Sequence, residues 1–95
     1  MAAYTVSITD ITDVEQYEKY KLLSKPSVER YGGRYLARGG TQAVLEGDWH
    51  PPRVVLIEFP SLAQAKAWYS SPEYSEARRA RQGAGTVDIV AVDGV

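Results

Sequence analysis

Arg38, in the stretch RYGGRYLARGG, residues 30–40, is the first candidate for chemistry. Arg34 and Arg38 fall in a short run that alternates like a strand, so simple alternation places them on one face with Leu36. A guanidinium presents a planar fork of N–H donors that matches a carboxylate or an enolate. Arg38 is therefore a candidate for binding an anionic oxygen of a small molecule.

Glu46 is the candidate partner of Arg38. If Gly39 and Gly40 turn the chain between two short strands, residue 38 and the middle forties come within cross-strand range. One interpretation is an ion pair that holds the strand register or a seam between subunits. The other is a site in which Arg38 binds an anion while Glu46 orients it or exchanges a proton. Glu58 is an alternative partner for the arginine.

Aromatic side chains suggest a pocket wall. The chain has seven tyrosines and two tryptophans but one phenylalanine, and a buried tyrosine hydroxyl needs a polar partner. We expect Tyr17, Trp68 and Tyr74 to wall a crevice between helices and sheet. Tyr74, Arg78 and Arg81 recur at i, i+4 and i+7, so Arg78 is a candidate for the cationic mouth of that crevice. The structural alternative is a tyrosine core, with the arginines favoured by the helix C-terminus.

Other chemistries find little support in the residues. The chain has no cysteine, which excludes disulfides and thiolate sites. His50 is the only histidine and has no second ligand at metal-binding spacing, so we expect no metal site and no cofactor. The Gly32-Gly33 and Gly39-Gly40 pairs do not stand between a strand and a following helix, as a phosphate-binding loop requires. We interpret both pairs as turns.

Length and charge restrict the class of protein further. The 95 residues fit a single domain, 1–95, and the net charge of −1 gives no field that attracts nucleic acid or an anionic membrane. The first residues, MAAYTVSITD, alternate polar and apolar and do not read as a signal peptide. No apolar run reaches membrane-spanning length. We expect a cytoplasmic protein that binds neither nucleic acid nor membrane.

The elements that position these residues can be read from periodicity and capping. Alternation, or a continuous apolar run, predicts extended segments. They cover residues 4–9, 34–38, 42–47, 53–59 and 86–92. Residues 34–47 fit two strands or one long bulged strand. Helix starts are indicated at Thr12, at Ser61, and at Ser71 with Pro72 in the first turn.

This order of elements is the split βαβ plan, an α+β, ferredoxin-like fold with an antiparallel sheet. Its helices cover one face of the sheet. The strands predicted at 53–59 and 86–92 nevertheless carry apolar residues on both faces. Because an apolar open face favours packing against another sheet, we expect a homodimer that buries sheet against sheet.

Several long motifs together resemble a known family. They are YGGRYLARGG, LEGDW, EFPSLAQAKAWYSSPEY and a basic helix ending in QGA. Across essentially the whole chain they resemble a bacterial domain-of-unknown-function family, number thirteen-thirty, of the dimeric α+β barrel superfamily. That superfamily includes antibiotic-biosynthesis monooxygenases and muconolactone isomerases. The resemblance implies a dimer that closes the barrel and a pocket between sheet and helices, and it implies no particular reaction.

Two functions from different classes remain open. The first is a small-molecule-binding protein or cofactor-independent enzyme that acts on a small aromatic or carboxylated metabolite. The family itself gives no reaction, but likeness to the wider superfamily suggests a proton-transfer isomerisation or a cofactor-independent oxygenation. No carboxylate or histidine stands out as a poised base, so the sequence leaves catalysis undecided. The alternative is a non-catalytic dimeric module, stress-associated or regulatory, whose polar clusters are structural.

Overall fold

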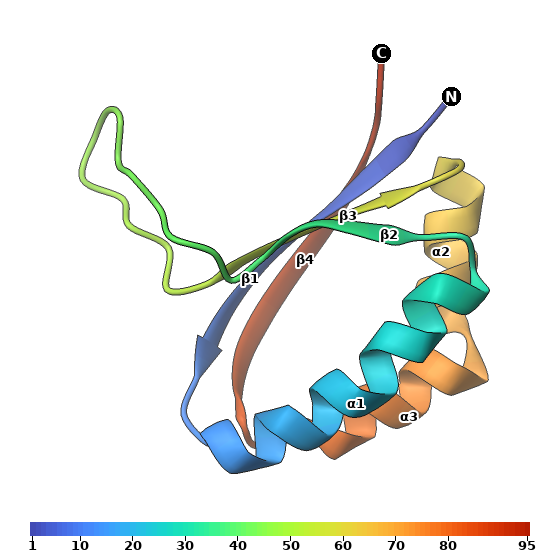
Figure 1. The fold of residues 1–95 in the computed structure, drawn as a ribbon, viewed down its shortest axis with the longest axis horizontal. Helices are drawn as coiled ribbons and strands as arrows, with labels where there is room; N and C mark the ends of the chain where they lie inside the picture. Colours follow the sequence, from blue (N-terminus) through green and yellow to red (C-terminus); the bar gives the residue numbers. More distant parts are fainter.

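The computed structural model describes all residues, 1–95, and has one four-stranded antiparallel sheet with its helices on one side (Figure 1). The elements follow in the order β1 (Ala3–Ile11), α1 (Val14–Arg30), β2 (Arg34–Arg38), β3 (Val54–Phe59), α2 (Leu62–Ser70), α3 (Pro72–Ala80) and β4 (Gly85–Asp93). In space the strands are arranged β2-β3-β1-β4, so β1 pairs with β3 and β4. This is the predicted α+β, ferredoxin-like arrangement. None of the helices is both long and apolar enough to cross a membrane.

The helices begin close to where capping signals predicted. Ser61 and Ser71 each accept the backbone N–H of the third residue after them, at 3.1 Å, as predicted for N-caps. The prediction of Thr12 as the cap of α1 is wrong by one residue. Asp13 is the cap, and its carboxylate accepts the N–H of Gln16 at 3.0 Å. A carboxylate at this position also interacts favourably with the helix dipole.

The predicted strand at 42–47 is not formed. Residues 40–52, which we call the arm, contain no helix or strand and project away from the sheet and helices (Figure 1). Leu45 is 94% exposed and Trp49 is 69% exposed, so this chain does not cover the apolar residues of the arm. An extended run becomes a strand only when a neighbour takes up its hydrogen bonds, and β3 begins only at Val54.

A bulge in β2 changes which way its arginines point. The register between β2 and β3 is interrupted around Leu36, and one extra residue moves every later side chain to the opposite face. Arg34 therefore lies on the open face, where its Nε is 2.7 Å from a carboxylate oxygen of Glu58. Arg38 points toward the helices, where it donates to the carbonyl oxygen of Lys21. The prediction that these two arginines share a face is wrong.

Strand β1 turns its polar side toward the helices. The buried, helix-facing side chains are Ala3, Thr5, Ser7 and Thr9. Those on the open side are Tyr4, Val6 and Ile8. A sheet covered by helices on one face usually has the opposite arrangement, with apolar residues toward the helices. β1 therefore contributes hydroxyl groups to the helix–sheet space and apolar side chains to the open face.

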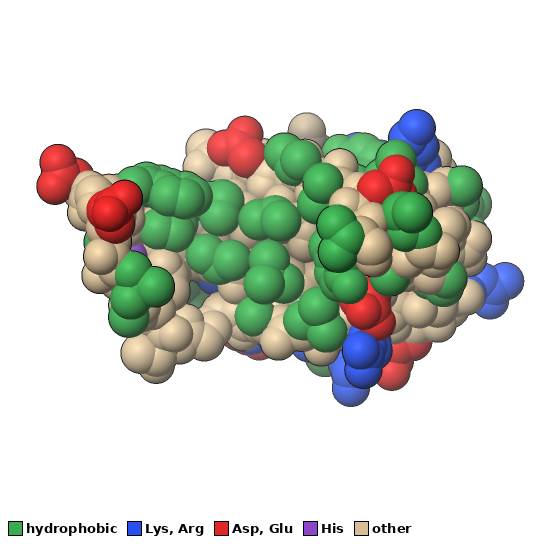
Figure 2. All heavy atoms as spheres, turned by 90° about the horizontal axis from the view of Figure 1, so that it is seen from above, with side chains coloured by type: hydrophobic (Ala, Val, Ile, Leu, Met, Phe, Trp, Pro, Cys, Tyr) green, Lys and Arg blue, Asp and Glu red, His purple; other side chains and the backbone are tan.

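The open face is continuous with other exposed apolar residues. Figure 2, which looks down from above the view of Figure 1, shows apolar side chains gathered over the middle of the molecule beside the projecting arm. On β4, Val90 is 64% exposed and Val92 is 50% exposed; they pair with Val6 and Tyr4 of β1. A patch of this kind is typical of a surface that another protein covers.

The core lies at one end of the helix–sheet space. The ring centroids of Trp68 are 5.1 Å from Phe59 and 4.0 Å from Tyr74, and all three side chains are buried. The indole N–H of Trp68 donates to the hydroxyl of Ser27 at 3.1 Å. The other end of the space, near Arg81, is less completely filled.

Candidate functional site

Three adjoining cavities lie between the helices and the sheet. The outer cleft has a volume of about 290 Å³ and lies against β4 under α2. The end cleft, about 300 Å³, lies where α3 leads into β4. The inner chamber, about 20 Å³, lies deeper between β1, β3 and α1. Because Arg81 and Val87 line all three, we treat the cavities as compartments of one crevice.

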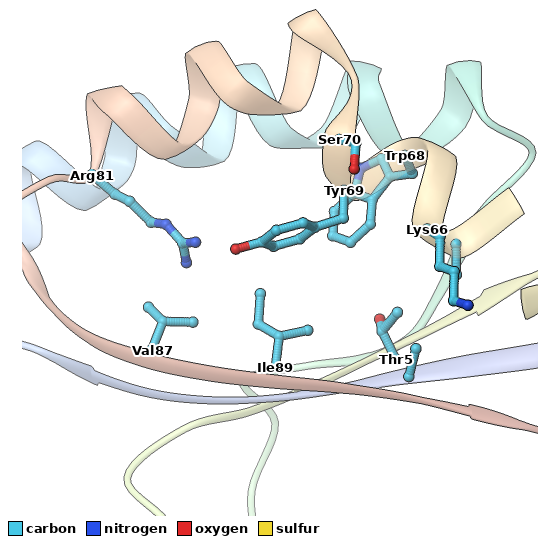
Figure 3. Close-up of a pocket in the computed structure, with 10 residues that line it drawn as sticks. Thr5, Lys66, Trp68, Tyr69, Ser70, Arg81, Val87 and Ile89 are labelled. Atoms are coloured by element: carbon cyan, nitrogen blue, oxygen red, sulfur yellow. The ribbon is translucent and has the colours of Figure 1, made fainter. Parts of the chain in front are cut away.

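The outer cleft has an apolar floor and polar ends (Figure 3). Val87 and Ile89 rise from β4 to form the floor. Above them the phenol of Tyr69 points toward the guanidinium of Arg81, and Thr5 and Lys66 lie at the opposite end. The two clefts fall at the lower end of the volumes found for small-molecule sites.

The charge of the crevice differs from that of the whole chain. Six of the eleven lysines and arginines line the three cavities, and none of the twelve carboxylates does. The six are Lys21, Arg38, Arg53, Lys66, Arg78 and Arg81. Of these, only Lys21 forms an ion pair, with Glu18. A cleft lined by one sign of charge concentrates ligands of the other sign, so this crevice favours anions.

Arg81 is held by aromatic rings and has no carboxylate partner. Its guanidinium carbon lies 5.0 Å from the ring centroid of Tyr20 and 5.8 Å from that of Tyr74. Such cation–π contacts position an arginine without neutralising its charge. The guanidinium of Arg81 therefore remains available to a ligand in the clefts.

Arg78 supports the neighbouring phenol. It donates to the hydroxyl oxygen of Tyr69 at 3.2 Å and to that of Ser75 at 3.3 Å, and its guanidinium carbon lies 4.4 Å from the centroid of the Tyr69 ring. A hydroxyl that accepts from a cation has its own proton free to donate. Tyr69 can therefore offer an O–H to an anion in the cleft beside Arg81.

The hydroxyls of Tyr20 and Tyr74, whose rings contact Arg81, are hydrogen-bonded to each other, with 2.8 Å between their oxygens. Burial raises the pKa of both phenols, and the nearby Tyr74 adds to the rise at Tyr20. Arg81 acts in the opposite direction on both pKa values. These phenols remain protonated near neutral pH, so they act as hydrogen-bond donors and acceptors rather than as bases.

The crevice gathers four of the six residues that we selected from the sequence. Arg38 lines the inner chamber, and Tyr17 lines that chamber and the end cleft. Trp68 lies between the inner chamber and the outer cleft, and Arg78 lines the end cleft. Tyr74 is fully buried in the core and lines none of these cavities.

Glu46 lies apart from this group. It is an exposed residue of the arm and borders a separate concavity formed mainly by the arm itself. The predicted ion pair between Arg38 and Glu46 is not formed, because residues 42–47 do not pair with β2. The alternative pairing of Arg38 with Glu58 is also wrong, because the register of β2 and β3 puts Arg34 opposite Glu58 and Arg38 opposite Val55.

Several residues of the crevice were not selected from the sequence. Arg81 follows Tyr74 and Arg78 at helical spacing, one turn further along, and this spacing could have identified it as a site residue. No sequence pattern identifies Arg53 as a site residue, because nothing in the neighbouring sequence shows that its side chain faces inward. The hydroxyls of β1 were recognised as one face of a strand, but alternation alone does not show which face meets the helices.

Comparisons with known proteins agree with this fold. Residues 2–95 match the family model DUF1330, described as a domain of unknown function. No curated protein matches the chain.

Three solved structures illustrate the likeness. A protein of unknown function from Rhodopseudomonas palustris aligns with a TM-score of 0.77 and 24% identity over 99% of this chain and 82% of its own. A dimeric ferredoxin-like protein of unknown function from Jannaschia sp. gives 0.71 and 9%, over 99% and 100%. SnoaB, a cofactor-independent oxygenase from Streptomyces nogalater, gives 0.66 and 8%, over 99% and 93%. At these identities the likeness shows the fold alone.

Proposed function

The chain belongs to the DUF1330 family, and from this starting point we propose that it binds a small organic anion with an apolar body, such as an aromatic carboxylate, in the outer cleft. The observation that carries the proposal is the charge of the crevice. Six cationic side chains and no carboxylate surround it, although the whole chain carries a net charge of −1. Four of the six, Arg38, Arg53, Arg78 and Arg81, are half-buried and form no ion pair, and such cations favour a ligand that supplies the missing charge.

The geometry gives each part of such a ligand a place. The apolar body lies on Val87 and Ile89, where burial of its surface contributes to affinity. Its carboxylate meets the guanidinium fork of Arg81 and the hydroxyl of Tyr69 at the same end of the cleft. The helices and β4 exclude water from two sides, which strengthens the charge-assisted bonds.

Binding is the function that these residues support best. A proton-abstracting enzyme needs a base within reach of its substrate, and no Asp, Glu or His lines the three cavities. A second candidate follows from the paired donors. Arg81 and Tyr69 would stabilise a substrate that becomes an enolate, as cofactor-independent oxygenation or isomerisation would require. Turnover of a bound acid, with or without oxygen, would favour this candidate over binding alone.

We also propose that the partner of this chain is a second copy, which covers the open face of the sheet. The apolar side chains of β1 and β4 on that face support the proposal, as does the exposed apolar part of the arm. The dimeric description of the Jannaschia protein, which shares the fold, is a further support.

Thermal-shift screening tests the binding proposal. The panel contains aromatic acids, quinones and lactones, and it is run on the wild type, Arg81→Gln and Arg79→Gln. A ligand at about a hundredfold its dissociation constant adds about 2.7 kcal/mol to the stability of the fold, which raises the melting temperature. Arg79 is an exposed arginine on the same helix and lines none of the three cavities, so it is a matched control.

We expect an aromatic acid to raise the melting temperature of the wild type and of Arg79→Gln but not of Arg81→Gln. The quinones and lactones, which lack the carboxylate, should give smaller shifts. An equal shift in all three proteins would show that Arg81 is not part of the site. The absence of a shift with every acid would contradict the proposed function.

A further inference from the structure

We propose that the inner chamber is a second anion subsite, formed by the arginines at the two ends of the arm, and that the ligand is an aromatic diacid. Its ring would lie in the outer cleft and its second acidic group would enter the chamber. The inference rests on the proposed function, because the first acidic group is the one that Arg81 binds.

Arg38 and Arg53 are brought together by the way the arm leaves the sheet. Arg38 is the last residue of β2, and Arg53 immediately precedes β3. The backbone N–H of Gly39 donates to the carbonyl oxygen of Val54 at 2.9 Å, which closes the base of the arm. Both arginines line the inner chamber, so two cations that are fifteen positions apart in sequence share one small space.

Neither arginine has a counterion. Arg38 makes one hydrogen bond, to the carbonyl oxygen of Lys21 at 3.4 Å, and its guanidinium carbon lies 4.4 Å from the centroid of the Tyr35 ring. The Nε of Arg53 is buried and has no hydrogen-bond partner. Leaving a buried N–H of a cation unpaired is costly, and an anion in the chamber would satisfy it.

The remaining polar groups around the chamber are compatible with an anion. Residues that carry hydroxyls line it on β1, α1 and β2, and no carboxylate lines it. The hydroxyls belong to Ser7, Thr9, Tyr17, Tyr20, Ser24 and Tyr35. Ser24 and Tyr35 are only weakly paired with each other, at 3.5 Å between their oxygens. A carboxylate accepts hydrogen bonds from hydroxyls and guanidinium groups alike.

Gly39 makes room for the inward-facing Arg53. Its φ of +73° is a backbone conformation that glycine adopts without penalty. A Cβ at this position would also lie 2.7 Å from the guanidinium carbon of Arg53, so any larger residue would displace that side chain. Gly39 therefore turns the chain and also leaves the space that the guanidinium of Arg53 occupies.

The size of the chamber defines which part of a ligand it can take. A volume of about 20 Å³ holds a group of about the size of a water, so the chamber can take one oxygen of a carboxylate and not a ring. Trp68, Arg81 and Val87 line both this chamber and the outer cleft, so the two compartments adjoin. A ligand whose ring lies in the cleft can therefore extend one acidic group past these residues.

Calorimetric titration tests the subsite. Benzoate and the three benzenedicarboxylate isomers are titrated into the wild type, Arg53→Gln, Gly39→Ala and Gly47→Ala. Gly47 also has a positive φ, of +86°, but a Cβ there meets nothing within 4 Å. Gly47→Ala therefore reproduces the backbone strain of Gly39→Ala without touching Arg53. Circular dichroism establishes that each variant is folded.

We expect at least one diacid to bind the wild type roughly tenfold to a hundredfold more tightly than benzoate, the effect of a bond to a charged group. Gly47→Ala should keep this preference, and Arg53→Gln and Gly39→Ala should lose most of it while still binding benzoate. Equal affinity for benzoate and all diacids, or a preference that survives in Arg53→Gln, would overturn the inference and leave the proposed function intact. Failure of every acid to bind the wild type would overturn both.

Discussion

Two arginines, Arg34 and Arg81, have different roles because their neighbours differ. Arg34 lies 2.7 Å from Glu58 on the open face, and this partner lowers the pKa of the Glu58 carboxyl through a hydrogen bond. An exposed pair of this kind contributes little to stability. The guanidinium of Arg81 contacts the rings of Tyr20 and Tyr74 and forms no ion pair, so its charge is not compensated by a carboxylate of the chain. The difference in partners, not in residue type, makes Arg81 the centre of the proposed site.

Tyr20 leads to a prediction about alkaline stability. Burial raises the pKa of its phenol, so the folded protein keeps the proton at a pH where the unfolded chain, with a tyrosine pKa of about 10, releases it. The stability contributed by this group is complete below pH ~10 and is lost as the pH rises further. Tyr20→Phe removes the titrating group. We expect its free energy of unfolding to fall less steeply above pH ~10 than that of the wild type, as measured by urea denaturation.

Identical slopes for the two proteins would contradict this explanation. They would mean that Tyr20 ionises as readily in the fold as in the unfolded chain, and that its bond to Tyr74 does not protect the proton. The comparison is between slopes, so it does not depend on how much the loss of the Tyr20–Tyr74 bond destabilises the variant at neutral pH.

At the scale of the element, β1 is the strand that makes the crevice polar. The Oγ1 of Thr5, a residue that lines the outer cleft, is buried and has no hydrogen-bond partner. A buried unsatisfied hydroxyl costs about 1–3 kcal/mol. We expect Thr5→Val, which is close in shape, to raise the free energy of unfolding by about 1 kcal/mol. Because Thr5 lies at the end of the cleft away from Arg81, the affinity for an aromatic acid with one carboxylate should change little.

Urea denaturation and calorimetric titration check the two parts of this prediction. Thr86→Val, at an exposed position of β4, is the control for the strand preference of valine. A loss of stability in Thr5→Val would show that the hydroxyl is satisfied in the free protein. A marked loss of affinity for the acid would show that its carboxylate lies at the Thr5 end of the cleft and not at Arg81.

The elements also show which features the sequence could predict. Local signals predicted the caps of α2 and α3, the strands β1, β3 and β4, and the order that defines the fold, because each depends on neighbouring residues. The bulge in β2 and the arm depend on which backbone groups find a partner across the sheet. Alternation shows that β1 has two different faces, but only the placement of the helices determines which of them forms the crevice.

The candidate site was predictable to a similar extent. The helical stripe that contains Arg78 and Arg81 was visible at helical spacing, and Tyr17 and Trp68 were expected at the crevice. The expected pair of Arg38 and Glu46 was wrong because it assumed a hairpin through residues 39–47. Arg53 reaches the chamber only because Gly39 leaves space for it, a contact between residues that local patterns do not connect.

At the scale of the whole molecule, the open face and the arm predict self-association. We expect the protein to sediment as a dimer, and Val90→Asp to shift it toward the monomer, because a carboxylate in the centre of an apolar interface is not solvated. Ala63→Asp adds the same charge at an exposed position of α2 and should leave the dimer unchanged. Sedimentation velocity of the three proteins measures this, and a wild type that sediments as a monomer at all concentrations would contradict the proposed interface.

The most direct test of the central proposal is to locate the bound ligand. Amide NMR spectra of the wild-type protein are recorded during a titration with the aromatic acid that gives the largest thermal shift. An anion in the outer cleft should shift the amide signals of Val87 and Ile89 on β4 and those of Tyr69 and Arg81. Shifts confined to the arm, residues 40–52, or to the solvent-facing side of α1 would contradict binding between helices and sheet.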